Sequence, residues 1–151
     1  MTNALSKMLS EREWILADGA TGTNLFNMGL MSGDAPELWN EQHPEKIKAL
    51  YKSAVDAGSD MFLTNSFGGN ASRLKLHSAQ DRAQDLSRMA AEIGRDVADA
   101  AGRPIVVAGS VGPTGYIMEP VGTLSHSDAV EIFHEQAEGL KAGGADVLWL
   151  E

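Results

Sequence analysis

Four short apolar segments without apolar–polar alternation constrain the fold of this chain most strongly. They are Trp14–Asp18, Asp60–Asn65, Pro104–Ser110 and Asp146–Glu151. Continuous apolar runs of this length are typical of strands buried on both faces, as in parallel sheets. The sequence therefore predicts four parallel strands joined by right-handed crossovers.

Amphipathic helical patterns occupy the connections between these segments. Apolar residues recur every three or four positions from Ile47, from Leu86 and from Ala129, which predicts three helices with one buried face each. Pro44 suits a first helical residue, and Gly58 suits the residue after a helix. The remaining local expectations are a helix at 4–11, short helical turns at 25–28 and 71–76, and a helix cap at Ser125 or Ser127.

The order β-α-β-α-β-α-β fits either an open doubly wound sheet or a (β/α)8 barrel. A barrel typically needs about 250 residues, so four strands in 151 residues would make half of one. A weak repeat, Ala57–Asp60 and Gly143–Asp146, precedes the second and fourth segments and favours βα modules. A final strand without a covering helix would expose an apolar edge. We therefore expect residues 1–151 to be the N-terminal part of a longer chain, or other polypeptide to supply the rest of the fold.

Charge and composition exclude several classes of partner. Twelve basic residues against twenty-one acidic ones give a formal net charge of −9, which argues against nucleic acid and against an anionic membrane surface. No apolar run approaches the roughly 20 residues of a membrane span, and Met1–Arg12 lacks the apolar core of a secretory signal. We expect a soluble cytoplasmic protein. The absence of cysteine excludes disulfides and thiolate metal sites built from this chain alone.

Polar residues follow each apolar segment at its carboxyl end. These residues are Asp18–Gly19, Asn65–Ser66, Gly109–Ser110 and Glu151. Because parallel strands present their carboxyl ends on one face, these groups should meet there and form a binding site. Any single one of them could instead be an ordinary turn residue, and Glu151 could be a solvated terminal residue. If Glu151 is as buried as the apolar VLWL run before it, its carboxylate needs a cationic or hydrogen-bonding partner or must take up a proton. An ammonium group on a substrate would serve as that partner.

The remaining motifs favour no particular cofactor. The loop Asp18–Thr23 is glycine-rich but lacks the known phosphate-binding patterns, so a ligand carboxylate on its backbone amides is equally consistent. The four histidines have no metal-ligand spacing. A barrel enzyme of the aldolase type would need a strand-end lysine or a metal-binding carboxylate pair, whereas the lysines fall on predicted helices or helix-rich loops.

Several ordered motifs resemble the homocysteine S-methyltransferase family, which includes betaine–homocysteine methyltransferases and the homocysteine module of cobalamin-dependent methionine synthase. The similarity runs from about Trp14 to Glu151 through the motifs ILADGATGTNLFNMGL, ELWN…HPE, DAGSDMFLTNSFGGN, GSVGPTG and GGADVLWLE. The resemblance implies a (β/α)8 barrel and transfer of a methyl group to the sulfur of homocysteine, giving methionine. It also implies that Asp18 and Gly19 contact homocysteine and that Glu151 contacts its amino group.

The same resemblance implies zinc, which keeps the homocysteine thiolate deprotonated. The zinc ligands of the family are cysteines in later strands, and this chain has none. The chain alone should therefore carry the homocysteine-facing half of the site, with Asp18, Gly19, Asn65, Ser66 and Glu151 as substrate-binding residues, and should be inactive by itself.

The methyl donor and the protein partners stay open at this point. Gly68 stands where animal betaine enzymes carry a tyrosine, and NSFGGN is closer to the methionine synthase module and its bacterial relatives. A separate cobalamin protein, betaine or S-methylmethionine could each supply the methyl group, and the chain could form homo-oligomers. The alternative function is a non-catalytic half-barrel that binds a small amino acid or assembles with another chain.

Overall fold

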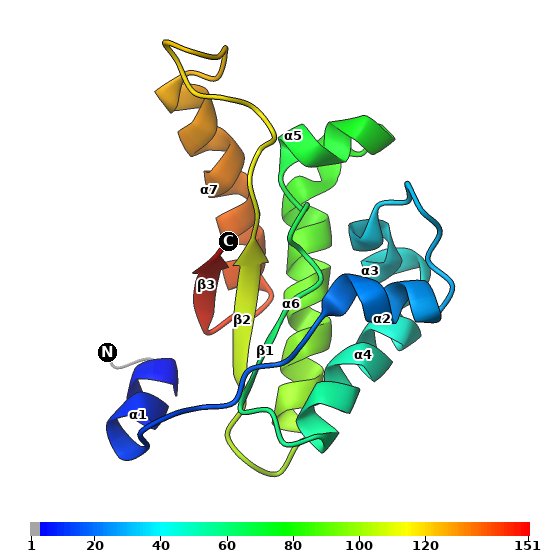
Figure 1. Ribbon diagram of the computed structural model, residues 1–151, viewed down its shortest axis with the longest axis vertical. Helices are drawn as coiled ribbons and strands as arrows, with labels where there is room; N and C mark the ends of the chain where they lie inside the picture. The colour runs from blue at the N-terminus through cyan, green and yellow to red at the C-terminus, as the bar shows by residue number, and fades with distance from the viewer. Residues whose placement is uncertain (1–3) are drawn as a thin grey trace.

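A computed structural model describes residues 4–151 (Figure 1), so part of the segment Met1–Arg12 considered above lies outside the described residues. Helices and strands alternate through most of the chain, as the sequence predicts. The elements in chain order are α1 Ala4–Glu11, α2 Thr21–Asn27, the 3-10 turn η1 Pro36–Leu38, α3 Trp39–Gln42, α4 Pro44–Asp56, β1 Met61–Leu63, α5 Ala71–Leu74, the 3-10 turns η2 Lys75–His77 and η3 Gln80–Arg82, α6 Ala83–Asp99, β2 Val106–Val111, α7 His126–Ala142 and β3 Val147–Leu150.

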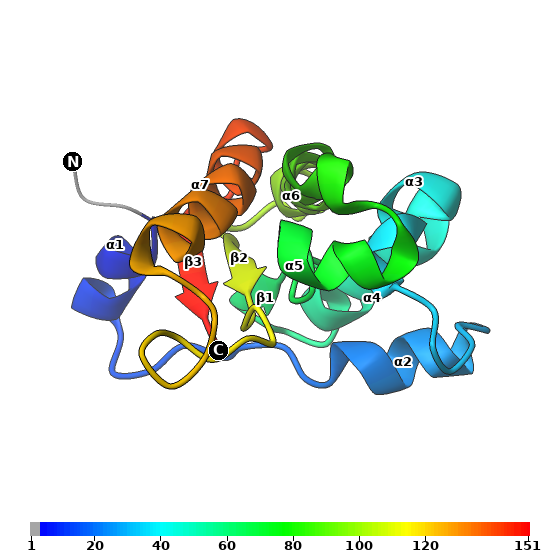
Figure 2. The same ribbon diagram turned by 90° about the horizontal axis from the view of Figure 1, so that it is seen from above.

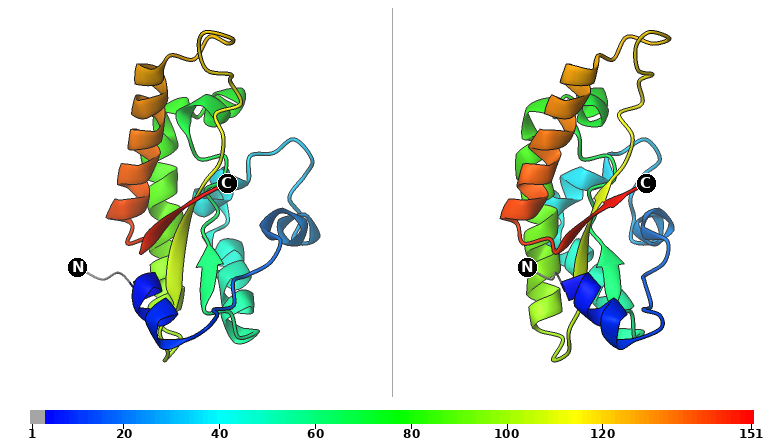
Figure 3. Two further views of the ribbon diagram at one scale, coloured as in Figure 1. Left: turned by 60° about the vertical axis from the view of Figure 1, so that its left-hand side comes forward. Right: turned by 90° about the vertical axis from the view of Figure 1, so that its left-hand side faces the viewer.

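The three strands form one parallel sheet in the order β1-β2-β3. Their arrows point toward the same end of the molecule, and α1 lies near the opposite end (Figure 3). Helices α4, α6 and α7 cover one face of the sheet (Figure 2). On the other face, Met8 of α1 packs against Met61, Val106 and Ala108. Parallel pairing thus brings all three carboxyl ends together, as a shared site requires.

The residues that the sequence predicts as helix ends do bound helices α4 and α7. Helix α4 begins at Pro44, and Gly58 follows it with a φ of +101°, a conformation that glycine adopts without steric cost. Helix α7 is capped by Ser125, whose hydroxyl accepts the backbone N–H of Asp128 at 3.1 Å. These predictions are confirmed, with Ser125 rather than Ser127 as the cap.

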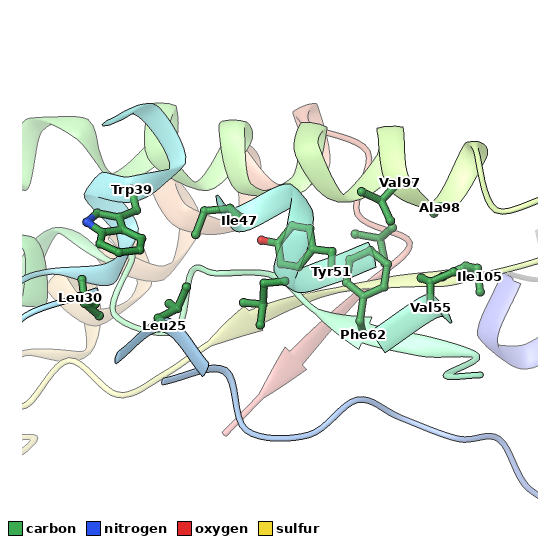
Figure 4. Close-up of a cluster of buried hydrophobic side chains, with 12 residues drawn as sticks. Leu25, Leu30, Trp39, Ile47, Tyr51, Val55, Phe62, Val97, Ala98 and Ile105 are labelled. Carbon is green, nitrogen blue, oxygen red and sulfur yellow. The ribbon is translucent and has the colours of Figure 1, made fainter. Parts of the chain in front are cut away.

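The main core lies between the sheet and helices α4 and α6 (Figure 4). At its centre the rings of Tyr51 and Phe62 stack with centroids 4.8 Å apart. Full burial of a phenylalanine side chain stabilises a fold by roughly 1.5–3 kcal/mol. On the far side of α6, Gly139 and Gly143 let the backbone of α7 approach that of α6, because a Cβ at either position would overlap a carbonyl oxygen of α6.

The first predicted strand, Trp14–Asp18, is shorter than expected. Only Ala17 pairs as a strand residue, in a single parallel bridge with Met61. On each side of this bridge, an aspartate carboxylate takes the place of a backbone carbonyl as the hydrogen-bond acceptor. Asp60 accepts the N–H of Leu16 at 3.0 Å, and Asp18 accepts the N–H of Leu63 at 3.2 Å. The segment keeps its predicted place beside β1 without forming a regular strand.

The repeated aspartates, Asp60 and Asp146, have the same structural role. Asp60 precedes β1, and its backbone N–H and carboxylate bond to the carbonyl and the N–H of Leu16. Asp146 precedes β3 and bonds in the same way to both backbone groups of Val107. Each carboxylate therefore fastens the start of its strand to the neighbouring segment, which gives the weak sequence repeat a structural reason. Within residues 4–151, no helix has the length and apolar character needed to cross a membrane.

Candidate binding site at the carboxyl ends of the strands

A cavity of about 420 Å³ lies at the carboxyl ends of the strands. Its volume is in the range of small-molecule sites. The loops after Asp18 and after β1, Ser110 of β2 and Glu151 after β3 line the cavity, together with residues of η1, α5 and η2. Of the residues that the sequence singled out, Gly19, Asn65, Ser66 and Glu151 line the cavity. Their contact with a ligand stays a prediction.

Asp18 lies directly beside the cavity, half-buried. Its carboxylate bonds to the backbone of Leu63, a residue of the cavity wall. Burial raises the pKa of Asp18, hydrogen bonds to backbone N–H groups lower it, and the negative charge of Glu151 raises it again. The two carboxylates are therefore close enough to repel each other. No arginine or lysine forms an ion pair with either of them within the described residues.

A ring of hydrogen bonds orients Glu151. The backbone N–H of Ser110 donates to Thr64 Oγ1 at 3.1 Å, and Ser66 Oγ donates to the carbonyl oxygen of Ser110 at 2.8 Å. The hydroxyl oxygens of Thr64 and Ser66 lie 2.6 Å apart. Because the single hydroxyl proton of Ser66 is donated to Ser110, Thr64 is the donor in this second bond. Ser110 Oγ is left to donate to Glu151 Oε1 at 2.7 Å. The side chains after β1 thus fix the residue that holds the carboxylate after β3.

Hydrogen bonds to the scaffold also hold Asn65 and Ser66, which line the cavity. The side-chain nitrogen of Asn65 donates to the carbonyl oxygen of Pro36 and to Asn40 Oδ1, at 2.8 and 2.9 Å. Its backbone N–H donates to the buried hydroxyl of Tyr51 at 2.6 Å. Gln136 of α7 holds the next carbonyl, that of Ser66, at 2.6 Å. These bonds fix the loop after β1 against four helical elements, η1, α3, α4 and α7.

Sequence reasoning missed Glu37, which is a buried acid in the cavity wall. It is 5% exposed, and its Oε1 accepts the backbone N–H of Gly68 at 2.7 Å. Burial raises the pKa of Glu37, while hydrogen bonds to backbone N–H groups and the charges of His77 and Arg73 lower it. The only sequence signal was its place in the ELWN motif.

Arg73 and His77 were missed as well. Both line the cavity from α5 and η2. They were not found because the sequence places them on a short helical turn rather than at a strand end, and only the tertiary structure brings that turn to the cavity.

The residues present do not fit a zinc site of the kind the resemblance implies. The chain has no cysteine, and residues 4–151 contain no cluster of three or more histidine, aspartate or glutamate side chains that could hold a metal ion. A catalytic zinc ion is typically held by three protein ligands, with its fourth coordination position left for water or substrate. No chemical step is therefore assigned to a metal held by this chain.

Comparisons with known proteins show which family this chain resembles in sequence and fold. Residues 15–151 match the homocysteine S-methyltransferase family. The methionine synthases of Mycobacterium tuberculosis and Mycobacterium leprae are 34% and 32% identical over 97% of this chain, which spans 13% of each of them. The metallated form of the homocysteine methyltransferase MmuM from Escherichia coli matches with a TM-score of 0.80 and 26% identity, over 99% of this chain and 57% of that one.

The fold and the cavity together define a βα protein with a cavity at the carboxyl ends of parallel strands. The chain belongs to the homocysteine S-methyltransferase family. It spans only part of the relatives that it matches.

Proposed function

We propose that this chain forms the homocysteine-binding half of a homocysteine S-methyltransferase, the first four strands of a (β/α)8 barrel. The observation that carries the proposal is the pair Asp18 and Glu151, two carboxylates at the ends of the first and last segments of the sheet that interact electrostatically beside one cavity, with no ion pair to an arginine or lysine of residues 4–151. Two such carboxylates are stabilised by a bound cation. The α-ammonium group of homocysteine supplies that cation.

The chain's own residues would bind and orient the amino acid. Ser110 presents the Glu151 carboxylate, and the backbone of Leu63 presents Asp18. An ammonium group between them donates charge-assisted hydrogen bonds, each worth about 1.5–3 kcal/mol. This leaves the thiol arm of homocysteine to extend toward polypeptide outside these four strands. Zinc and the methyl donor, whether betaine, S-methylmethionine or a cobalamin protein, would be met there.

Binding of homocysteine to the full chain tests the proposal by isothermal titration calorimetry. We expect Asp18→Asn and Glu151→Gln each to weaken binding by about tenfold or more, since each removes one charged acceptor of the ammonium group. Glu131→Gln, an isosteric change of an exposed carboxylate on α7, is the matched control and should leave the affinity unchanged. Unchanged affinity in both site variants would exclude the assignment.

The lack of a zinc site within this chain supports a second candidate, a non-catalytic half-barrel that binds an amino acid. The two candidates differ in what happens when the remaining strands are supplied. A complete barrel containing this half should convert homocysteine to methionine with a methyl donor, measured by mass spectrometry of the product. A binding module should bind homocysteine and produce no methionine.

A further inference from the structure

Arg73 stands apart from the other arginines of the chain. The sequence contains six arginines, and five of them, Arg12, Arg82, Arg88, Arg95 and Arg103, form ion pairs with aspartate or glutamate. Arg73 forms none with any residue of 4–151, and it is the arginine that lines the cavity. In a chain of net charge −9, an arginine without a carboxylate partner is the exception.

The fold fixes the backbone position of Arg73, whose side chain is exposed. Asn70 Oδ1 accepts the backbone N–H of Arg73 at 3.1 Å and so caps α5, while Asn70 Nδ2 donates to the carbonyl oxygens of Gly112 and Pro113 at 3.4 and 3.3 Å. Helix α5 is thereby fastened to the loop after β2. The guanidinium group of Arg73 lies against Gly115 of that loop. A Cβ at Gly115 would lie 3.3 Å from a terminal nitrogen of Arg73, a close contact that glycine avoids.

A second basic side chain faces the same space. His77 follows Arg73 by four residues, a spacing that places two side chains on one face of a helical segment. Both residues line the cavity, and both act electrostatically on the buried Glu37. The cavity thus carries carboxylates at the strand ends and basic groups on the α5–η2 side, a charge pattern complementary to a zwitterionic ligand.

We propose that Arg73, with His77 beside it, forms a carboxylate-binding subsite in the cavity that contains the strand-end carboxylates. A guanidinium group binds a carboxylate through two parallel N–H donors, which also fixes the orientation of the ligand. The ligand carboxylate belongs either to homocysteine itself or to a carboxylate-bearing methyl donor such as betaine or S-methylmethionine. The inference rests on the proposed function, because that function supplies the amino acid bound beside Asp18 and Glu151.

Calorimetric titration of the full chain and its Arg73→Gln variant tests the subsite. The matched control is Lys75→Gln, the same loss of one positive charge on the same short helical segment, at an exposed residue that does not line the cavity. Homocysteine is compared with 3-aminopropane-1-thiol, which keeps the ammonium and the thiol but lacks the carboxylate. Betaine and S-methylmethionine are titrated into the homocysteine complex.

If the carboxylate is that of homocysteine, Arg73→Gln weakens homocysteine binding by about tenfold or more and leaves 3-aminopropane-1-thiol unchanged. If it is that of the donor, Arg73→Gln weakens the donor and leaves homocysteine unchanged. Arg73→Lys should recover part of either loss, and the thermal midpoint of each variant checks that the fold is intact.

An effect of Arg73→Gln no larger than that of Lys75→Gln on all of these ligands would overturn the subsite and leave the proposed function standing. Equal losses for homocysteine and 3-aminopropane-1-thiol would also overturn it, because the effect would not depend on a carboxylate. Failure of the unmodified chain to bind homocysteine would overturn the proposed function, and the subsite with it.

Discussion

Asp60 and Asp18 lie at opposite ends of the same pairing between the segment 14–18 and β1, and they differ in their electrostatic surroundings. Each carboxylate accepts one backbone N–H across the pair. Asp60 also faces Arg12 at 2.7 Å and Arg103 at 3.5 Å. Asp18 faces another acid, Glu151. Two residues with the same hydrogen-bonding role therefore have opposite charge environments.

The pKa values follow this difference. The hydrogen bond from the N–H of Leu16 and the two arginines lower the pKa of Asp60 below its ordinary range. Burial and Glu151 raise the pKa of Asp18. A compensated carboxylate contributes to stability, whereas an uncompensated one beside a cavity is a candidate for ligand binding. The acids at the start of the strands therefore have a structural role, and the acids at their ends are candidates for ligand binding.

The largest expected effect is on stability at the start of the strands. Asp60→Ala removes an almost buried carboxylate that bonds to the backbone and to two arginines, and should lower the free energy of unfolding by about 2–3 kcal/mol in urea titrations. Homocysteine affinity of the folded variant should stay within twofold. A large loss of affinity at unchanged stability would contradict the division between the two ends.

The pH dependence of stability gives the sign of the Asp60 contribution. A carboxyl group with a lowered pKa in the folded state stabilises the fold above its unfolded pKa, and this contribution is lost as the pH falls through the folded value. Urea midpoints measured from neutral pH downward should therefore fall less steeply in Asp60→Ala than in the unmodified chain. If the urea midpoints of the two proteins fell equally with decreasing pH, another titrating group would be responsible for the loss of stability in acid.

A smaller effect is expected from the ring that orients Glu151. Thr64→Val keeps the shape of the side chain but removes the acceptor of the Ser110 N–H and the donor to Ser66. We expect a loss of about 1–2 kcal/mol in stability, together with weaker homocysteine binding because Ser110 no longer holds Glu151 as firmly. Thr114→Val, at a buried threonine outside the ring, serves as the control for the substitution itself.

The smallest effect should have the opposite sign. Asp18→Asn removes the repulsion with Glu151 and keeps an oxygen acceptor for the Leu63 N–H, so stability at pH 7 should rise by about 0.5–1 kcal/mol. Because the folded pKa of Asp18 is raised, its ionisation opposes folding above the unfolded pKa, and the gain should vanish when the pH falls below that value. A loss of stability at pH 7 would place Asp18 with Asp60 among the structural acids.

The features that the sequence predicted are those that local residues determine. Helix α4 follows from Pro44 and Gly58, and α7 from Ser125, because caps act on their own helix. The first strand was overestimated because Trp14 and Leu16 are apolar, yet both are exposed and the segment pairs with β1 at one residue. Strand identity depends on neighbours, which a single segment does not reveal.

The residues of the candidate site also fall into those that the sequence predicts and those that only the tertiary structure reveals. Asp18, Ser66 and Glu151 were predicted because parallel topology alone brings strand ends together. Glu37, Arg73 and His77 reach the cavity from helical turns, and no periodicity indicates which turn will fold over a strand end. Asn65 was predicted as a substrate-binding residue, and this stays a prediction: it lines the cavity, and its amide nitrogen bonds to Pro36 and Asn40.

The hydrogen-bonded ring around Ser110 has a consequence for the entropy of binding. Both backbone groups of Ser110 are held by side chains that follow β1, so the direction of its hydroxyl is set before any ligand arrives. The Glu151 carboxylate inherits that direction. Although Glu151 is exposed, this hydrogen bond already restricts its side chain in the folded chain, so a ligand has less side-chain freedom to remove, a preorganisation that strengthens association without adding a contact.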